Sequence, residues 1–389
     1  MAGLNRGPRG RVMLFPLPFQ GHLSPMLQLA DVLHGRGLAI TILHTTFNAP
    51  NPASHPEFDF IAVADEMPDA VAAPKRRPGH DRCHERGHGG VGRAAAELGL
   101  PTIVLQTSSA AAVRLFRSNA MLHEKGYLPA QEHELNKPVT ELPPVRVSDL
   151  FDPSKYPNQE TARKILDMAT EPTTGSSGIV INTFEALETP ELEAIRDELA
   201  ASGISVFAIG PLHKLSTIGG AGRPRPPARP EAASLFCGSF VVASSSAPRM
   251  QSCRKGSSEV RGRGKVVRWA PQQDVLAHRA VGGFWTHGGW NSTLESICEG
   301  VPMLCSPFFG DQLANGRYVE DVWEIGTLLV GKLERGEVER DVARLMEGGD
   351  GATTRERAKE LKTKSVESLK NAGSTQLAVN QLVAHILSL

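Results

Sequence analysis

Residues Trp269 to Gln312 read WAPQQDVLAHRAVGGFWTHGGWNSTLESICEGVPMLCSPFFGDQ, and this stretch decides the fold class of the chain. Two apolar runs of strand length flank a glycine turn and a short helical segment. These elements are a strand over 281–286, a turn over 287–289, a helix over 294–298 and a strand over 301–306. Strand, turn, helix and strand form a βαβ unit of a parallel sheet, so the sequence predicts an α/β protein.

The helix that follows the glycine turn is suited to bind a phosphate. Asn291, Ser292 and Thr293 supply side chains that can cap its first turn, and Gly300 can end it. A helix that starts directly after glycines presents unpaired N–H groups and the positive end of its dipole to an anionic ligand.

The same stretch closely resembles the signature box of the plant family-one UDP-glycosyltransferases. The resemblance rests on the opening W-x-P-Q, the HGGWNS core, Glu295 and the closing Asp311-Gln312. Because many separated positions agree, it is far more specific than a lone GxGxxG. An NAD-dependent dehydrogenase would need that motif between a strand and a helix, and this chain lacks it there. It implies the GT-B architecture, in which two Rossmann-like domains face each other across a cleft, with the second domain incomplete here.

Composition excludes several classes of partner. The chain has 389 residues, with 42 Lys and Arg against 42 Asp and Glu, so no net field attracts nucleic acid or an anionic membrane. Five scattered cysteines favour a reducing compartment. No apolar run approaches the ~18 residues that a membrane span needs. We therefore expect a cytoplasmic protein, and a monomer, with no membrane span and no nucleic-acid partner.

A second βαβ unit opens the chain and carries a histidine. Strands are predicted over 11–16 and 38–44, with a helix between them that Ser24 would cap and Pro25 would begin. His22 precedes this helix at the carboxyl end of the first strand, where open α/β sheets bind ligands. It could be a plain loop histidine or a general base, since imidazole titrates near neutrality. The segment PFQGHLSPMLQLADVLHGRG resembles the family's acceptor-side motif, whose histidine is the catalytic base.

In the family that this chain resembles, a buried strand ends in an aspartate that orients the histidine. Here residues 74–93 contain almost no apolar residues and no period, as a flexible basic linker would. Counting back from AELGLP places the orienting acid near Glu85, with Asp81 close by. Four residues of this segment have spacings that could suit a metal, but a solvated loop explains their polarity, so no metal is predicted. They are His80, Cys83, His84 and His88.

The resemblance also implies a set of donor-site residues, each matched to one part of UDP-glucose. Uracil and ribose would meet an indole face, an amide and a carboxylate, from Trp269, Gln272 and Glu295. The diphosphate would meet His287, Asn291 and Ser292 at the helix N-terminus. The sugar would meet Trp290, Asp311, Gln312 and Thr107. A glutamine at the end of the box points to glucose rather than galactose.

Several of these positions also have structural explanations that involve no ligand. Trp269 could pack in the core, and Gln272 could be a surface glutamine. Glu295 could be a first-turn acid that the helix dipole favours, and Thr107 could simply end a strand.

Residues 219–265 form a second segment without the family pattern. The segment begins GGAGRPRPPARP and lacks periodicity, and only 235–243 could be a strand. A basic RNA-binding tail is an alternative, although its arginines are not interleaved with aromatic residues. We expect an acceptor-binding domain over 1–212, an irregular segment over 213–264 and a UDP-sugar-binding domain over 265–389, with the last helix packing back on the first domain.

The expected reaction is inverting transfer of glucose to a hydroxyl of a small plant metabolite, of phenolic, flavonoid or benzoxazinoid type. It needs no metal and no cofactor besides UDP-glucose as co-substrate. The proline-rich segment 123–151 resembles the acceptor-side loop of cereal benzoxazinoid glucosyltransferases. The alternative is a non-catalytic UDP-sugar-binding relic, because the histidine lacks an evident acidic partner and the donor half is short.

Overall fold

The computed structural model describes residues 10–46, 49–63, 94–170, 175–216, 235–238, 270–331, 333–346 and 348–389. Three predictions fall outside these ranges: the orienting acid at Glu85 or Asp81, the histidine and cysteine spacing beside it, and the uracil platform Trp269.

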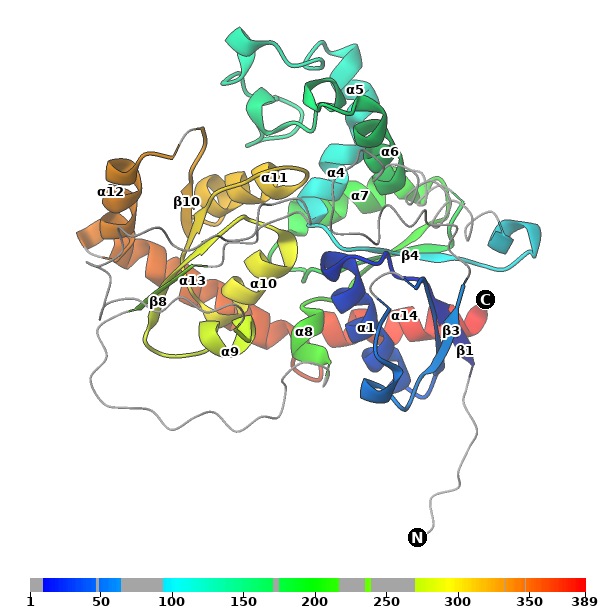
Figure 1. The fold of residues 1–389 in the computed structure, drawn as a ribbon. Coiled ribbons are helices and arrows are strands. Elements are labelled where there is room, and N and C mark those ends of the chain that lie inside the picture. The colour runs from blue at the N-terminus through cyan, green and yellow to red at the C-terminus, as the bar shows by residue number, and fades with distance from the viewer. Residues whose placement is uncertain are drawn as a thin grey trace.

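The first half of the chain folds, within the described residues, into two parallel sheets of three strands, ordered β1-β2-β3 and β4-β5-β6 (Figure 1). The strands are β1 (Arg11–Leu14), β2 (Ala39–His44), β3 (Asp59–Ala62), β4 (Ile103–Gln106), β5 (Gly178–Ile181) and β6 (Ser205–Ala208). Parallel strands need crossover connections, and helices supply most of them. These are α1 (Gln20–His34), α4 (Ala110–Arg117), α5 (Asn119–Glu124), α6 (Gln159–Thr170) and α7 (Thr189–Ala200), followed by α8 (Leu212–Leu215).

Helix α1 begins earlier than the sequence predicts. Its N-cap is Phe19, whose carbonyl accepts from the backbone N–H groups of His22 and Leu23 at 2.9 and 2.8 Å. The prediction that Ser24 caps the helix is therefore wrong, and Pro25 lies inside it. His22 consequently lies in the first turn of a helix rather than in a loop.

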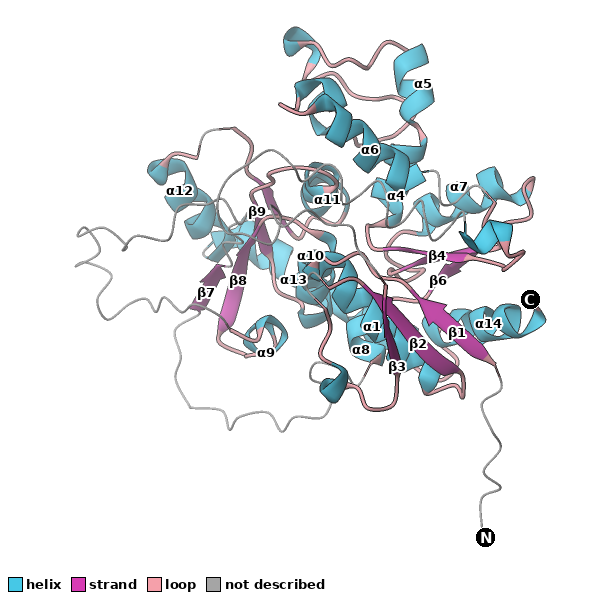
Figure 2. Ribbon diagram, turned by 45° about the vertical axis from the view of Figure 1, so that its right-hand side comes forward, coloured by secondary structure: helices cyan, strands magenta, loops and turns pink. Residues whose placement is uncertain are grey.

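The second half contains a four-stranded parallel sheet with the order β10-β9-β8-β7 (Figure 2). Its strands are β7 (Leu235–Gly238), β8 (Val281–Thr286), β9 (Met303–Cys305) and β10 (Gly326–Leu328). The strand predicted over 235–243 is confirmed for its first four residues, which pair with β8. The helices are α9 (Gln272–Leu276), α10 (Trp290–Glu299), α11 (Gln312–Arg317) with a π-helical turn (Tyr318–Val322), α12 (Arg335–Met346), α13 (Gly348–Ser368) and α14 (Ser374–Ser388).

Helix α14 leaves the second half and packs on the first (Figure 1). Its buried Val379, Leu382 and Val383 join the core of α1, β2 and β6. Polar bonds hold the first turn of α14 in this contact. The Thr375 hydroxyl donates to the Gly210 carbonyl at 2.7 Å, and the Arg36 guanidinium donates to Gln376 Oε1 at 2.6 Å.

A buried ion pair joins the two halves beside the π-helical turn. Arg317 Nε lies 2.9 Å from Asp149 Oδ2, and the two side chains are 6% and 0% exposed. Asp149 also accepts from the backbone N–H of Arg146 at 2.9 Å and from the Ser148 hydroxyl at 3.1 Å. A neighbouring bond runs from the Tyr318 hydroxyl to Glu191 Oε1 at 2.7 Å.

Removing one member of this pair should be costly, because the other charge is left buried without its partner. We expect Asp149→Ala to lower the free energy of unfolding by about 3–5 kcal/mol, measured by urea denaturation. Glu356→Ala is the control, since its pair with Lys359 is exposed and should contribute only about 0–1 kcal/mol. Equal losses in both variants would contradict a special role for the buried pair.

Candidate active site

His22 meets a hydroxyl from the second sheet of the first half. Its Nδ1 lies 2.9 Å from Thr107 Oγ1, and Thr107 directly follows β4. The ring of His22 also lies edge-on to Phe19, with centroids 6.5 Å apart. Thr107 was predicted to contact the donor sugar, but its hydroxyl here contacts the imidazole. The predicted base His22 and its hydrogen-bond partner Thr107 thus lie together, beyond the carboxyl ends of β1 and β4.

The turn before α10 is built on two glycines. Gly288 has a φ of +76°, in the left-handed region that favours glycine. A Cβ on Gly289 would collide with Nε2 of the His287 imidazole, so this ring lies directly over the second glycine. Burial lowers the pKa of His287, which favours its neutral form. Its Nδ1 is buried and has no hydrogen-bond partner within the described part of the chain.

Helix α10 begins at Trp290, with the extended residue Gly289 as its N-cap and no side-chain cap. The prediction that 291–293 cap the helix is therefore wrong, because these residues already belong to its first turn. The N–H groups at this end are left without a side-chain acceptor, which suits an anion. The predicted end is confirmed: Gly300 is the C-cap, with a left-handed φ of 68°.

Asn291 connects this helix to the residue before His22. Its Nδ2 donates to the Gly21 carbonyl at 3.0 Å. In an uninterrupted helix that carbonyl would accept from the N–H four residues ahead. The residue four ahead is Pro25, which has no N–H, so the Gly21 carbonyl can serve the other half of the molecule.

Trp290, which was predicted to pack on the donor sugar, has a buried side chain. Its indole is 3% exposed and lies among apolar side chains that include Leu187 and Leu294. Its Nε1 donates to the Asn182 carbonyl at 2.8 Å, at the end of β5. The ring also packs against Trp323, with centroids 6.1 Å apart. The indole is therefore buried between the two halves, and its contact with the donor sugar stays a prediction.

Glu295 forms a cluster with two glutamines of α9. Gln272 Nε2 donates to one carboxylate oxygen at 2.8 Å and to the Ser292 hydroxyl at 3.0 Å. Gln273 Nε2 donates to the other oxygen at 3.0 Å. Burial raises the pKa of Glu295, and the hydrogen bonds from Gln273 and Gln272 oppose that rise. The structure thus brings together Gln272, Ser292 and Glu295, three predicted donor-site residues.

Asn315 is a residue that the sequence analysis missed. It is fully buried and lies one helical turn after Asp311. Its Nδ2 donates to the Gly288 carbonyl at 3.0 Å and to Asp311 Oδ2 at 3.1 Å, and its Oδ1 accepts from the Ser109 hydroxyl at 2.8 Å. One amide therefore links the glycine turn, a predicted sugar-binding acid and the first half. The four-residue spacing from Asp311 was the available signal.

The last two predicted residues lie at the start of α11, where Asp311 is the N-cap and Gln312 the first helical residue. Burial raises the pKa of Asp311, and hydrogen bonds from Asn315 and Ser108 oppose that rise. Gln312 is buried, and its Oε1 accepts from the backbone N–H groups of Phe308 and Phe309 at 2.8 and 3.3 Å. The amide oxygen of Gln312 is therefore used to hold its own loop.

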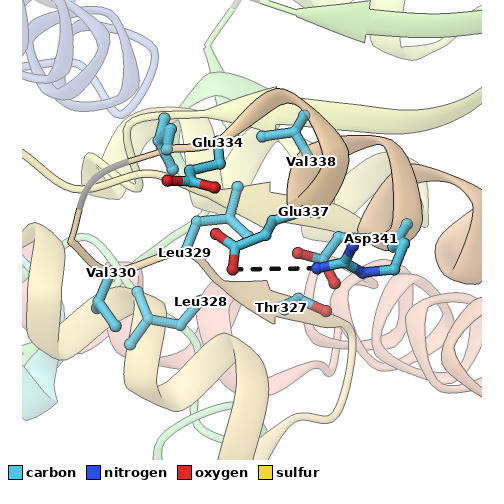
Figure 3. A pocket seen from close by; sticks show the side chains of 10 residues that line it. Thr327, Leu328, Leu329, Val330, Glu334, Glu337, Val338 and Asp341 are labelled. Carbon is cyan, nitrogen blue, oxygen red and sulfur yellow. Dashed lines mark ion pairs between the residues drawn. The ribbon is translucent and has the colours of Figure 1, made fainter.

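A cavity of about 300 Å³ lies between β10 and α12 and contains none of the predicted residues (Figure 3). Its wall includes the carboxylates of Glu334, Glu337 and Asp341. The Arg340 guanidinium nitrogen Nη2 lies 3.9 Å from Glu337 Oε1. In the ranges that the structure describes, no group of three His, Cys, Asp or Glu residues is arranged to hold a metal ion. No described helix is long and apolar enough to cross a membrane.

Comparison with known sequences supports the resemblance. Residues 255–351 match the family model described as UDP-glucoronosyl and UDP-glucosyl transferase. The chain is 36% identical to UDP-glycosyltransferase 76F2 of Arabidopsis thaliana, over 97% of both chains. It is 37% identical to DIMBOA UDP-glucosyltransferase BX9 of Zea mays, over 93% of both. The first alignment extends over 460 positions, so several dozen of them have no residue in this 389-residue chain.

Solved structures share the fold. One is Phytolacca americana UGT2, complexed with UDP-2fluoro-glucose and pterostilbene, which has a TM-score of 0.78 at 21% identity. The match covers 98% of this chain and 100% of the Phytolacca chain. Medicago truncatula UGT71G1, complexed with UDP-glucose, has a TM-score of 0.77 at 22% identity, with 100% of both chains covered. The predicted GT-B class is thereby confirmed. Together with the sequence relatives, this shows that the chain belongs to the plant family-one UDP-glycosyltransferases, enzymes that transfer a sugar from a UDP-sugar donor.

Proposed function

We propose that this chain is an inverting UDP-glucosyltransferase that moves glucose from UDP-glucose to a hydroxyl of a small plant metabolite, with His22 as general base. The bond from Asn291 to the Gly21 carbonyl carries the proposal, because it holds the first turn of α10 against the residue next to His22. A base and a diphosphate site held this close can act on opposite sides of one sugar carbon.

In the proposed reaction, His22 Nε2 takes the proton of the acceptor hydroxyl while the acceptor oxygen attacks the anomeric carbon. The bond between that carbon and the β-phosphate oxygen breaks, and UDP leaves from the opposite face, so the configuration inverts. The N–H groups at the start of α10 and the neutral His287 would stabilise the charge that develops on UDP. The scheme assigns the diphosphate to N–H donors and includes no metal.

The remaining donor contacts follow from the hydrogen-bonding groups of the site that are still available. Each Glu295 oxygen accepts from one glutamine, which leaves lone pairs for both hydroxyls of a ribose diol. Asp311 would accept from sugar hydroxyls, and Gln312 would meet them through its amide nitrogen, because its oxygen is occupied. Stacking of uracil on Trp269 and the domain division at 212 and 265 remain part of this proposal.

The acceptor class is inferred from relatives. The maize relative is named a DIMBOA UDP-glucosyltransferase, and the Phytolacca structure holds pterostilbene. We propose that this chain uses small hydroxylated acceptors of benzoxazinoid, phenolic or flavonoid type. We also propose that it acts in the cytoplasm. One observation favours a second candidate, a UDP-sugar-binding relic: several dozen aligned positions of a relative are missing here.

The role of His22 can be tested by its replacement with alanine. We expect His22→Ala to lower kcat about 10²–10⁴-fold, because general base catalysis typically contributes that much. UDP binding, measured by calorimetry, should be unchanged. The assay is UDP-glucose turnover with a panel of hydroxylated acceptors.

His34→Ala is the matched control, because this histidine is exposed in the last turn of α1, at the opposite end of the helix from His22. An unchanged kcat in His22→Ala would contradict the mechanism. UDP binding without turnover on any acceptor would favour the relic.

Glu295 should make donor binding depend on pH. Its pKa is raised, so its carboxylate takes up a proton earlier as pH falls and then accepts hydrogen bonds less well. The KM for UDP-glucose should therefore rise on the acid side. Glu295→Gln should raise that KM about tenfold or more and remove this pH dependence, since hydrogen bonds to charged groups contribute about 1.5–3 kcal/mol.

The control for this experiment is Glu339→Gln, on the exposed face of α12. An acid-side rise in KM that persists in Glu295→Gln would assign the effect to another group.

A further inference from the structure

We propose that Thr107 is the positioning residue of His22: its hydroxyl accepts a hydrogen bond from Nδ1–H, which makes Nε2 the unprotonated nitrogen, the one that takes the proton of the acceptor hydroxyl. The inference rests on the proposed role of His22 as base. It replaces the expected contact of Thr107 with the donor sugar, because the Thr107 oxygen lies 2.9 Å from Nδ1.

Both partners are fixed by regular structure rather than by free loops. Thr107 follows β4, whose last residue Gln106 is in register with Ile181 of β5. Two residues later, the Ser109 hydroxyl accepts from the Ala112 N–H at 3.1 Å and caps α4. On the other side, the N–H of His22 donates to the Phe19 carbonyl at 2.9 Å. A contact between two such elements can hold a ring in one orientation.

The contact matters because a neutral imidazole carries one proton on either of two nitrogens. The hydrogen bond made by one nitrogen decides which of the two is protonated. When Nδ1–H donates to Thr107, Nε2 is unprotonated and can take the acceptor's proton. The resulting imidazolium keeps its Nδ1–H bond to the hydroxyl. The opposite arrangement, in which the hydroxyl donates to Nδ1, would put a proton on Nε2 and block the base.

A hydroxyl differs from a carboxylate in this position. A carboxylate would orient the ring and also stabilise its charged form, as in a His-Asp pair. A hydroxyl supplies orientation without charge. The expected effect of removing it is therefore modest, about tenfold in kcat, which corresponds to about 1.4 kcal/mol.

The kinetic test compares Thr107→Val with Thr107→Ser. We expect valine to lower kcat about tenfold with the KM for UDP-glucose unchanged, and serine to restore kcat because it keeps the hydroxyl. Thr102→Val, at the other end of β4, is the matched control and should have no effect. A raised KM for UDP-glucose with unchanged kcat would return Thr107 to the donor sugar and overturn the proposal.

A double variant tests whether Thr107 acts through His22. In the His22→Ala background, Thr107→Val should cause no further loss, since coupled residues are non-additive. The same tenfold loss in both backgrounds would overturn the proposal.

The tautomer can be measured without turnover. Long-range ¹H–¹⁵N spectra of the ¹⁵N-histidine-labelled full chain, with His22 assigned by its loss in His22→Ala, should show an unprotonated Nε2 in the original protein. A mixture of tautomers is expected in Thr107→Val. A protonated Nε2 in the original protein would refute the positioning role. If no acceptor is glucosylated while Nε2 is unprotonated, the proposed function fails and the positioning of His22 stands.

Discussion

The absent N–H of Pro25 is the constraint on which the site depends. It leaves the Gly21 carbonyl without its usual helical donor, and the amide of Asn291 takes that place. The preceding residue, Trp290, donates its indole N–H to the Asn182 carbonyl. The side chains of the first two residues of α10 thus donate hydrogen bonds to two backbone carbonyls of the first half, and these bonds anchor the helix. Its backbone N–H groups remain free of side-chain caps, as an anion site requires.

The parts of the fold that local patterns control could be predicted. Strand β8, helix α10 and strand β9 follow from apolar runs separated by glycines, and Gly300 ends α10 as its conformational freedom allows. The errors lie at helix starts. Polar residues resemble side-chain caps, but the backbone of Phe19 and of Gly289 begins α1 and α10 without one. A cap depends on where the preceding strand ends, which single residues do not reveal.

The site could be predicted only as a list of residues, because its contacts join distant positions. Asn291 reaches Gly21 across 270 residues, and Thr107 reaches His22 across 85. An indole has the same signature whether it stacks on a ligand or fills an interface, so the burial of Trp290 was not evident. In the sequence Asn315 has the pattern of an ordinary helix residue, because its partners Ser109 and Gly288 are distant along the chain.

The return of α14 to the first half has a consequence for exchanging parts between relatives. Its apolar side chains share a core with α1 and β2, and Arg36 and Gly210 bond its first turns. The first structural half is therefore discontinuous in sequence. A chimera spliced once, between the two halves, would pair the body of one parent with the closing helix of another. A compatible exchange needs a second splice near residue 373, so that the tail travels with the half it completes.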